Sequence, residues 1–257
     1  MRQFLLVLMA GLALVLGGCT SVPDGGDGDG DGDGVDTQAF YPNDEDNYWT
    51  YAVTVGGGGN FDWTIIDDPG YQLCYSQQRM RQHWEGAPDN TYRDTFFTDD
   101  ETEAIIMEGY MWYDEGDPEG EFMFEDHPWT WLRWQSDGLD VGDTWDAWDI
   151  SGVPPEVFYW QGFPADSLGF DLTADVESAG DFDYKDNTLT AYKVVFSGDI
   201  IIELDGVDPE DWEHYDYQMD HYFVPEFGWV KIQIYESGSL VPDELFTLTD
   251  TNVLIPH

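Results

Sequence analysis

Residues 48–55 read YWTYAVTV, and this stretch decides the class of fold. Trp49, Tyr51 and Val53 occupy alternate positions, so their side chains point to one face of an extended strand and the residues between them point to the other face. Alternation of this kind predicts a β-strand that buries one face.

The same period of two recurs along the chain, and no helical period is sustained for ten residues. We therefore predict an all-β protein. Further strands are expected at Phe61–Ile66, Tyr71–Arg81, Thr91–Thr98, Ala104–Trp112, Gly120–Phe124, Trp129–Trp134, Thr144–Ile150, Gly169–Glu177, Thr188–Leu204, Glu213–Val224, Gly228–Tyr235 and Leu240–Thr249.

Turn signals rich in Gly, Asp and Pro separate these strands, at residues 56–60, 67–70, 114–119, 137–138, 205–211 and 237–238. Because links this short join adjacent strands, we expect an antiparallel meander. A sheet this large either becomes strongly curved, as a half-barrel or barrel, or splits into a β-sandwich. Val153–Asp166, which contains three Pro, is expected to be a long loop inside one domain.

The N-terminus carries a targeting signal. A positively charged start is followed by 13 apolar residues, Phe4–Leu16, which is shorter than the roughly 20 that span a bilayer and predicts a signal peptide over residues 1–18. Leu16-Gly17-Gly18-Cys19 resembles the lipobox of prokaryotic lipoproteins, which implies a diacylglyceryl thioether on Cys19 after cleavage. The alternative is a secreted protein that is merely cleaved near Cys19. Lipidation predicts an extracytoplasmic protein held to the cell membrane or the outer membrane.

Residues 19–36 are dominated by alternating Gly and Asp, which bury nothing and repel one another, so we expect an extended tether. The folded domain then comprises residues 37–257. If Cys19 is lipidated, Cys74 is the one cysteine left and no intrachain disulfide can form. Cys74 lies in an apolar alternating stretch and is expected to be a small buried side chain.

The charge is strongly one-sided. The chain of 257 residues has 54 acids and 8 bases, and without Arg2 and the six tether Asp the folded part has 48 acids against 7 bases, formally −41. Nucleic-acid binding is excluded because it needs a basic surface. Abundant Asp with three Lys resembles the composition of proteins from halophilic prokaryotes, so we expect salt to stabilise the fold by screening. Binding of divalent ions by the acids is the competing interpretation.

Several short motifs resemble a group of uncharacterised bacterial lipoproteins. They are Tyr41-Pro42 with Tyr48-Trp49-Thr50-Tyr51, then Val141-Gly142-Asp143-Thr144-Trp145, Ala191-Tyr192-Lys193-Val194, and His221-Tyr222-Phe223-Val224-Pro225-Glu226-Phe227-Gly228-Trp229-Val230-Lys231. The first motif departs from the group's pattern, because acidic residues 44–46 replace the usual Leu-x-x-Gly. The resemblance implies an antiparallel β architecture and export, and carries over no activity. Gly142 and Gly228 are expected at turns with positive φ, and Trp49, Trp145 and Trp229 in the core.

Four tryptophans are candidate ligand contacts. Trp129 and Trp131 share one face of a strand and could stack on sugar rings, and Trp145 and Trp148 alternate with carboxylates in the same way. The alternative is that all four rings belong to the core.

Calcium is the one cofactor that the sequence suggests. Two acidic turns could supply its oxygen ligands, with plain solvated turns as the alternative. The candidate ligands are Asp114, Asp117 and Glu119 in the first turn and Asp205, Asp208 and Asp211 in the second. His214 and His221 are seven residues apart, which places them on opposite faces of a strand and argues against a shared metal ion.

No catalytic fingerprint is present in the chain. We therefore expect a non-catalytic surface lipoprotein that binds a partner or contributes to the envelope. The alternatives are a carrier that shelters an apolar ligand or lipid in a curved sheet, and a glycan-active hydrolase with a carboxylate pair that the sequence does not single out.

Overall fold

The computed structural model describes residues 20–21, 42, 47–56, 59–74, 77–85, 92–100, 104–114, 117–124, 126–134, 138–153, 165–235, 241–242 and 244–256. Within these ranges, residues 20–21, 59, 67–100, 108 and 110–123 are described by their backbone alone.

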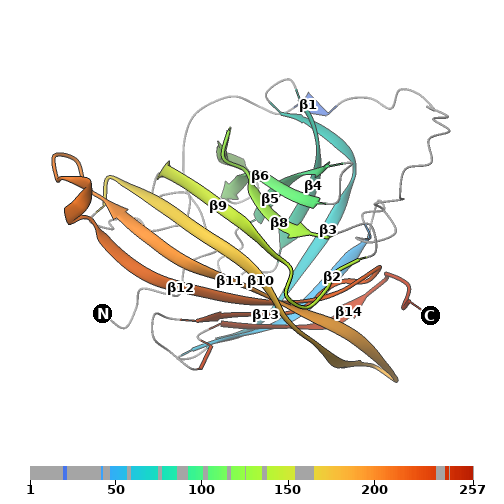
Figure 1. Ribbon diagram of the computed structural model, residues 1–257. Helices are drawn as coiled ribbons and strands as arrows, with labels where there is room; N and C mark the ends of the chain where they lie inside the picture. The colour runs from blue at the N-terminus through green and yellow to red at the C-terminus, as the bar shows by residue number, and fades with distance from the viewer. Residues whose placement is uncertain are drawn as a thin grey trace.

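The described part of the chain is almost entirely β-strand (Figure 1). The strands are β1 (Thr20–Ser21), β2 (Tyr48–Val55), β3 (Gly59–Cys74), β4 (Gln77–Glu85), β5 (Tyr92–Asp100), β6 (Ala104–Asp114), β7 (Asp117–Met123), β8 (Trp129–Arg133), β9 (Thr144–Val153), β10 (Ser167–Tyr184), β11 (Asn187–Glu203), β12 (Glu213–Val224), β13 (Gly228–Tyr235) and β14 (Glu244–Thr251), with one short 3-10 helix, η2 (Pro209–Asp211).

The strands form one antiparallel sheet in the order β7-β6-β5-β4-β3-β2-β14-β13-β12-β11-β10-β9. Two meanders, β2 to β7 and β9 to β14, are joined where β2 pairs with β14. β8 pairs with β6, next to β7, and β1 pairs with β3. The predicted antiparallel meander is thus confirmed, and the pairing of β2 with β14 is a long-range contact that no turn signal indicates.

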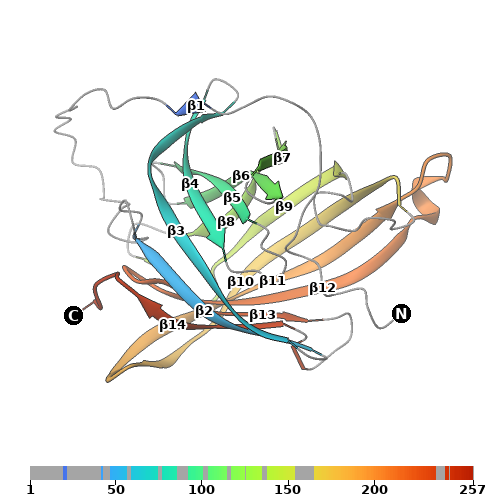
Figure 2. The same ribbon diagram turned by 180° about the vertical axis from the view of Figure 1, so that it is seen from behind.

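The sheet curls so strongly that its two ends approach each other, with β8 beside β9 (Figures 1 and 2). One side-chain hydrogen bond joins β9 to β8, from Trp145 to Thr130, and a second runs from Trp148 to His127 just before β8. The two strands share no backbone ladder, so the sheet remains an open, strongly curved structure. The predicted half-barrel is confirmed, whereas full closure and the alternative β-sandwich are not observed.

Most strand positions agree with the sequence prediction, and β2, β12 and β13 have the expected ends. The turn predicted at residues 67–70 is wrong, because β3 continues through it. The chain accommodates Pro69 and Gly70 as an irregularity in the pairing with β4 between Asp67 and Tyr71. Of the predicted loop Val153–Asp166, residues 154–164 lie outside the described residues.

The core fills the concave side of the sheet. In β2, Trp49, Tyr51 and Val53 are at most 2% exposed, as their alternation predicts. β10 alternates in the same way, with Leu172, Ala174 and Val176 inside and the residues between them exposed.

The turn between β12 and β13 shows why glycine is needed at one motif position. Gly228 has φ +100°, and a Cβ there would lie 2.9 Å from Nε1 of Trp49. That indole N–H donates to the carbonyl of Phe227 at 2.9 Å. Positive φ at Gly142 and Gly228 and burial of Trp49, Trp145 and Trp229 confirm these sequence expectations.

Part of the predicted tether has a defined position. β2 pairs with β3 only as far as Ile66, so the far half of β3 has a free edge on that side, and Thr20 and Ser21 pair there with Leu73 and Gln72. Cys19 and residues 22–36 lie outside the described residues. No helix in the described ranges is long and apolar enough to cross a membrane.

Candidate functional site

The four tryptophans singled out in the sequence all lie inside the molecule. Trp129 and Trp131 on β8 are 8% and 2% exposed, and Trp145 and Trp148 on β9 are 6% and 3% exposed. They come together because β8 and β9 meet where the two ends of the sheet approach each other.

These rings are packed against other aromatic rings. Trp148 lies nearly parallel to Trp129, with ring centroids 5.2 Å apart, and to Phe170, at 4.5 Å. Trp145 Nε1 donates to the carbonyl of Thr130 and Trp148 Nε1 to that of His127, both at 3.0 Å. The four tryptophans therefore pack β8 against β9, and we call this contact the β8–β9 seam. A sugar could stack on these rings only if the contacts between them broke.

His221 lies at the centre of the same interior. Its ring makes edge-to-face contacts with Trp229 at 4.7 Å, Phe196 at 5.1 Å and Trp131 at 6.1 Å. Burial lowers the pKa of His221 to about 3, so the imidazole is neutral at ordinary pH. His214, by contrast, is on the outer face, where its Nδ1 lies 3.1 Å from Oδ2 of Asp199. The opposite faces predicted from the spacing are observed.

The proposed calcium ligands lie in two turns, of which the structure describes the side chains of one. Asp205, Asp208 and Asp211 are exposed in and around η2, and the backbone N–H of Asp205 donates to the carboxylate of Asp166 at 2.6 Å. The other three ligands belong to the β6–β7 hairpin, where Asp114 pairs with Asp117 and Glu119 lies in β7, and their side chains are not among those described. Within the described residues, no three His, Cys, Asp or Glu side chains are close enough together to hold a metal ion.

The convex face carries a row of aspartates across four adjacent strands. Asp171 on β10 lies directly opposite Asp149 on β9 and Asp199 on β11, and Asp199 lies opposite Asp216 on β12. We call these four residues the aspartate ladder. Carboxylates directly opposite each other on a sheet face repel and destabilise it. Among the described side chains, His214 lies beside this ladder, at Asp199, and it is charged only when protonated.

A second polar cluster on the convex face contains two of the three lysines, Lys193 and, over the ring of Tyr222, Lys231. Asp220 is 1% exposed, and its carboxylate accepts hydrogen bonds from Gln218, at 2.9 Å, and from Tyr235, at 3.0 Å. The ammonium of Lys193 lies 2.9 Å from Asp220 and 2.8 Å from Glu177. Because this cluster joins β10, β11, β12 and β13 and compensates a buried carboxylate, it stabilises strand pairing.

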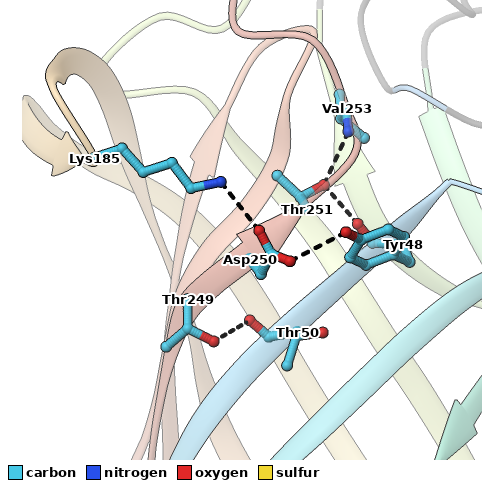
Figure 3. Close-up of polar contacts among 7 residues, drawn as sticks. All are labelled: Tyr48, Thr50, Lys185, Thr249, Asp250, Thr251 and Val253. Carbon is cyan, nitrogen blue, oxygen red and sulfur yellow. Dashed lines mark hydrogen bonds and ion pairs between the residues drawn. The ribbon is translucent and has the colours of Figure 1, made fainter.

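The third lysine holds the tip of the long β10–β11 hairpin (Figure 3). Lys185 donates to Asp250 on β14 at 3.0 Å, and Tyr48 on β2 donates to the same carboxylate at 3.1 Å. Hydrogen bonds from Lys185 and, to a smaller extent, from Tyr48 lower the pKa of Asp250. Interactions with Tyr184, whose ring lies 4.9 Å from the ammonium, and with Asp250 raise the pKa of Lys185. Beneath this contact, the buried ring of Tyr184 packs on Phe227 at 5.3 Å.

Sequence reasoning missed both polar clusters and the aspartate ladder. The signal for the lysines was their scarcity, since each of three Lys in so acidic a chain has a defined carboxylate or ring partner. The ladder depends on strand register, which the sequence does not display.

No family model matches the chain, and no curated protein matches it. Two solved structures are similar. A predicted exported protein with a YmcC-like fold from Bacteroides fragilis is 11% identical, with a TM-score of 0.43, and the match covers 83% of this chain and 98% of that one. A predicted lipoprotein from Parabacteroides distasonis is 11% identical, with a TM-score of 0.37, over 83% of this chain and 99% of that one. At these identities and scores neither structure contributes to the assignment of function, which depends on the contacts described above.

Proposed function

We propose that this chain is a lipid-anchored lipoprotein of the cell envelope whose β domain works at high salt and acts by binding or as a structural element, without catalysis. The N-terminal apolar run and Cys19 support export and anchoring.

The observation that carries the salt adaptation is the aspartate ladder. In dilute buffer the Debye length is about 30 Å, and carboxylates on neighbouring strands repel at full strength. At molar salt the Debye length is about 3 Å, which is shorter than the spacing of about 5 Å between opposite Cβ atoms. A sheet that keeps this register is therefore best suited to concentrated salt.

The packed interior supports a binding or structural role on the outer face. The four candidate tryptophans are packed among aromatic rings, and Trp145 and Trp148 also donate to backbone carbonyls, so the described concave side works mainly as a core. The convex face, with its ladder and its lysine cluster, then presents the surface that other envelope components meet.

Thermal melts of the mature chain carrying Cys19→Ser test the role of the ladder. In low salt, Asp171→Asn removes one charge from between Asp149 and Asp199, and we expect a gain in stability of up to about 1 kcal/mol. In molar KCl this gain should disappear. The matched control is Asp175→Asn, because Asp175 lies opposite Thr144 and Val195 and should gain less.

The salt proposal fails if the two variants behave alike in low salt, or if the gain from Asp171→Asn persists in molar KCl. A melt in low salt with millimolar Ca²⁺ separates screening from site binding. A rise as large as that from molar KCl would mean that the acids bind calcium, since a ligand of the native state stabilises it by mass action.

A further inference from the structure

The interior around His221 contains buried polar atoms without partners. Neither ring nitrogen of His221 has a hydrogen-bond partner, although the side chain is 3% exposed. Nε1 of Trp229 and Nε1 of Trp129 are also buried and unpaired. More than nine in ten buried polar groups in proteins do have a partner, which is protein or ordered water.

These atoms belong to one group of touching rings. His221 contacts Trp229 at 4.7 Å and Phe196 at 5.1 Å, and Phe196 contacts Trp129 at 5.7 Å. The four residues come from β12, β13, β11 and β8, so the group connects three adjacent strands of the sheet with β8.

Other indoles of the same core are satisfied by the protein. Trp49, Trp145 and Trp148 each donate to a backbone carbonyl at 2.9–3.0 Å. The protein thus supplies acceptors for these three indole N–H groups, whereas those of Trp129 and Trp229 are unpaired and belong to the rings around His221, the one buried histidine among the described residues. The indole N–H of Trp212, beside η2, is also buried and unpaired but is not among these ring contacts. A buried polar group without a partner loses its hydrogen bonds to water on folding and gains none, so several such groups together destabilise the native state.

The chemistry of these atoms defines a complementary group. Neutral imidazole has one N–H donor and one bare acceptor nitrogen, and the indole of Trp229 has one donor. A hydroxyl can accept from the indole and donate to the bare nitrogen, whereas a carboxylate only accepts and an ammonium only donates. A neutral hydroxyl also avoids placing a charge in this apolar surrounding.

We propose that the interior beside His221 and Trp229 binds a neutral guest hydroxyl. Two sources share this chemistry: an ordered water, and the hydroxyl or carboxylic acid end of an otherwise apolar molecule. The inference goes beyond the proposed function, which needs no guest inside the sheet.

The test uses the full mature chain, labelled with ¹⁵N and purified without denaturant. We expect the Trp229 indole N–H, assigned with Trp229→Phe, to resonate downfield as a hydrogen-bonded donor. A nuclear Overhauser effect to that proton at the water frequency identifies water. A discrete molecule in a chloroform–methanol extract, whose removal shifts the same resonance, identifies an amphiphile.

A stability measurement provides a second readout. His221→Leu should lower the melting temperature by about 3–8 °C at pH 8, because the guest loses a partner. Trp145→Phe, which removes an N–H bonded to protein, is the matched control and should leave the Trp229 resonance unchanged. Absence of both the water signal and an extracted molecule overturns the proposal, and so does a His221→Leu chain at least as stable as the wild type.

Discussion

At the scale of single residues, the curved sheet depends on backbone positions that tolerate no side chain. Gly198 on β11 has φ +152°, and a Cβ there would lie 2.0 Å from the carbonyl oxygen of Asp171 on β10. The neighbouring strand cannot move away, since β10 and β11 are paired on both sides of this point. Gly198 therefore sets how closely these two strands approach.

We expect Gly198→Ala to destabilise the domain by at least about 2 kcal/mol, because it combines a clash with backbone and an unfavourable φ. Gly180→Ala is the control: nothing lies within 4 Å of a Cβ at Gly180, and the change should be nearly neutral. Urea unfolding of both variants measures the difference. Equal stability of the two would show that β10 and β11 pack less tightly here than described.

His221 predicts an acid sensitivity of the fold. Burial lowers the pKa of His221 to about 3, against 6.5 in the unfolded chain. Between pH 3 and pH 6.5 the imidazole is therefore protonated in the unfolded chain and neutral in the native state. The described rings against it, Trp131, Phe196 and Trp229, carry no charge. The contribution of the neutral His221 ring to the free energy of unfolding is therefore fully present above pH 6.5. It is lost as the pH falls below 6.5, by up to about 1.4 kcal/mol per pH unit.

The carboxylates also titrate in acid, so the informative quantity is the difference between the wild type and His221→Leu. We expect the wild type to lose stability relative to the variant between pH 6.5 and pH 4, as measured by urea unfolding at each pH. A difference that stays constant over this range would contradict a buried neutral imidazole.

At the scale of elements, the weakest junction is the seam between β8 and β9, where two indole N–H groups replace a backbone ladder. Trp145→Phe and Trp148→Phe keep an aromatic ring and remove the donor, so each should lower the free energy of unfolding by about 1 kcal/mol.

Amide hydrogen exchange shows where in the sheet these substitutions act. Amides of β8 should exchange faster in the double variant, while those of β12 and β13, inside the sheet, keep their protection. An equal increase of the exchange rate in all strands would mean that β8 and β9 do not separate independently of the rest of the sheet.

At the scale of the whole molecule, the decisive feature is the join between the two meanders, where the N-terminal strand β2 lies between β3 and the C-terminal strand β14. Tyr48 at the start of β2 contacts Asp250 near the end of the chain (Figure 3). The chain therefore reaches its complete fold only when both ends are present, and the proposed anchor precedes this join.

Anchoring through Cys19 is testable in cells. Cys19→Ser removes the thiol that would carry the lipid, so labelling with radioactive palmitate should disappear and the protein should move from the membrane fraction to the soluble fraction. Cys74→Ser is the control and should keep both label and location. Membrane association that survives Cys19→Ser would indicate another mode of attachment.

The alternation of apolar residues was sufficient to predict the all-β class, the antiparallel meander and most strand positions, because a period of two follows from strand geometry whatever the partner. It failed at residues 67–70, where Asp, Pro and Gly favour a turn locally but pairing with β4 carries the strand through. Burial of the four candidate tryptophans could not be decided in advance, because a ring on one face of a strand is buried or exposed according to what lies opposite.

The sequence by itself determined the composition-dependent properties: the strand periodicity, the apolar run that precedes Cys19, and the excess of acids that makes salt relevant. Tertiary structure alone decided which strands pair across long distances, and so brought Asp149, Asp171, Asp199 and Asp216 into one row and His221 among aromatic rings. The physical reason is register. Local sequence defines which face of a strand is apolar, but only pairing of the whole sheet defines which side chains lie opposite one another.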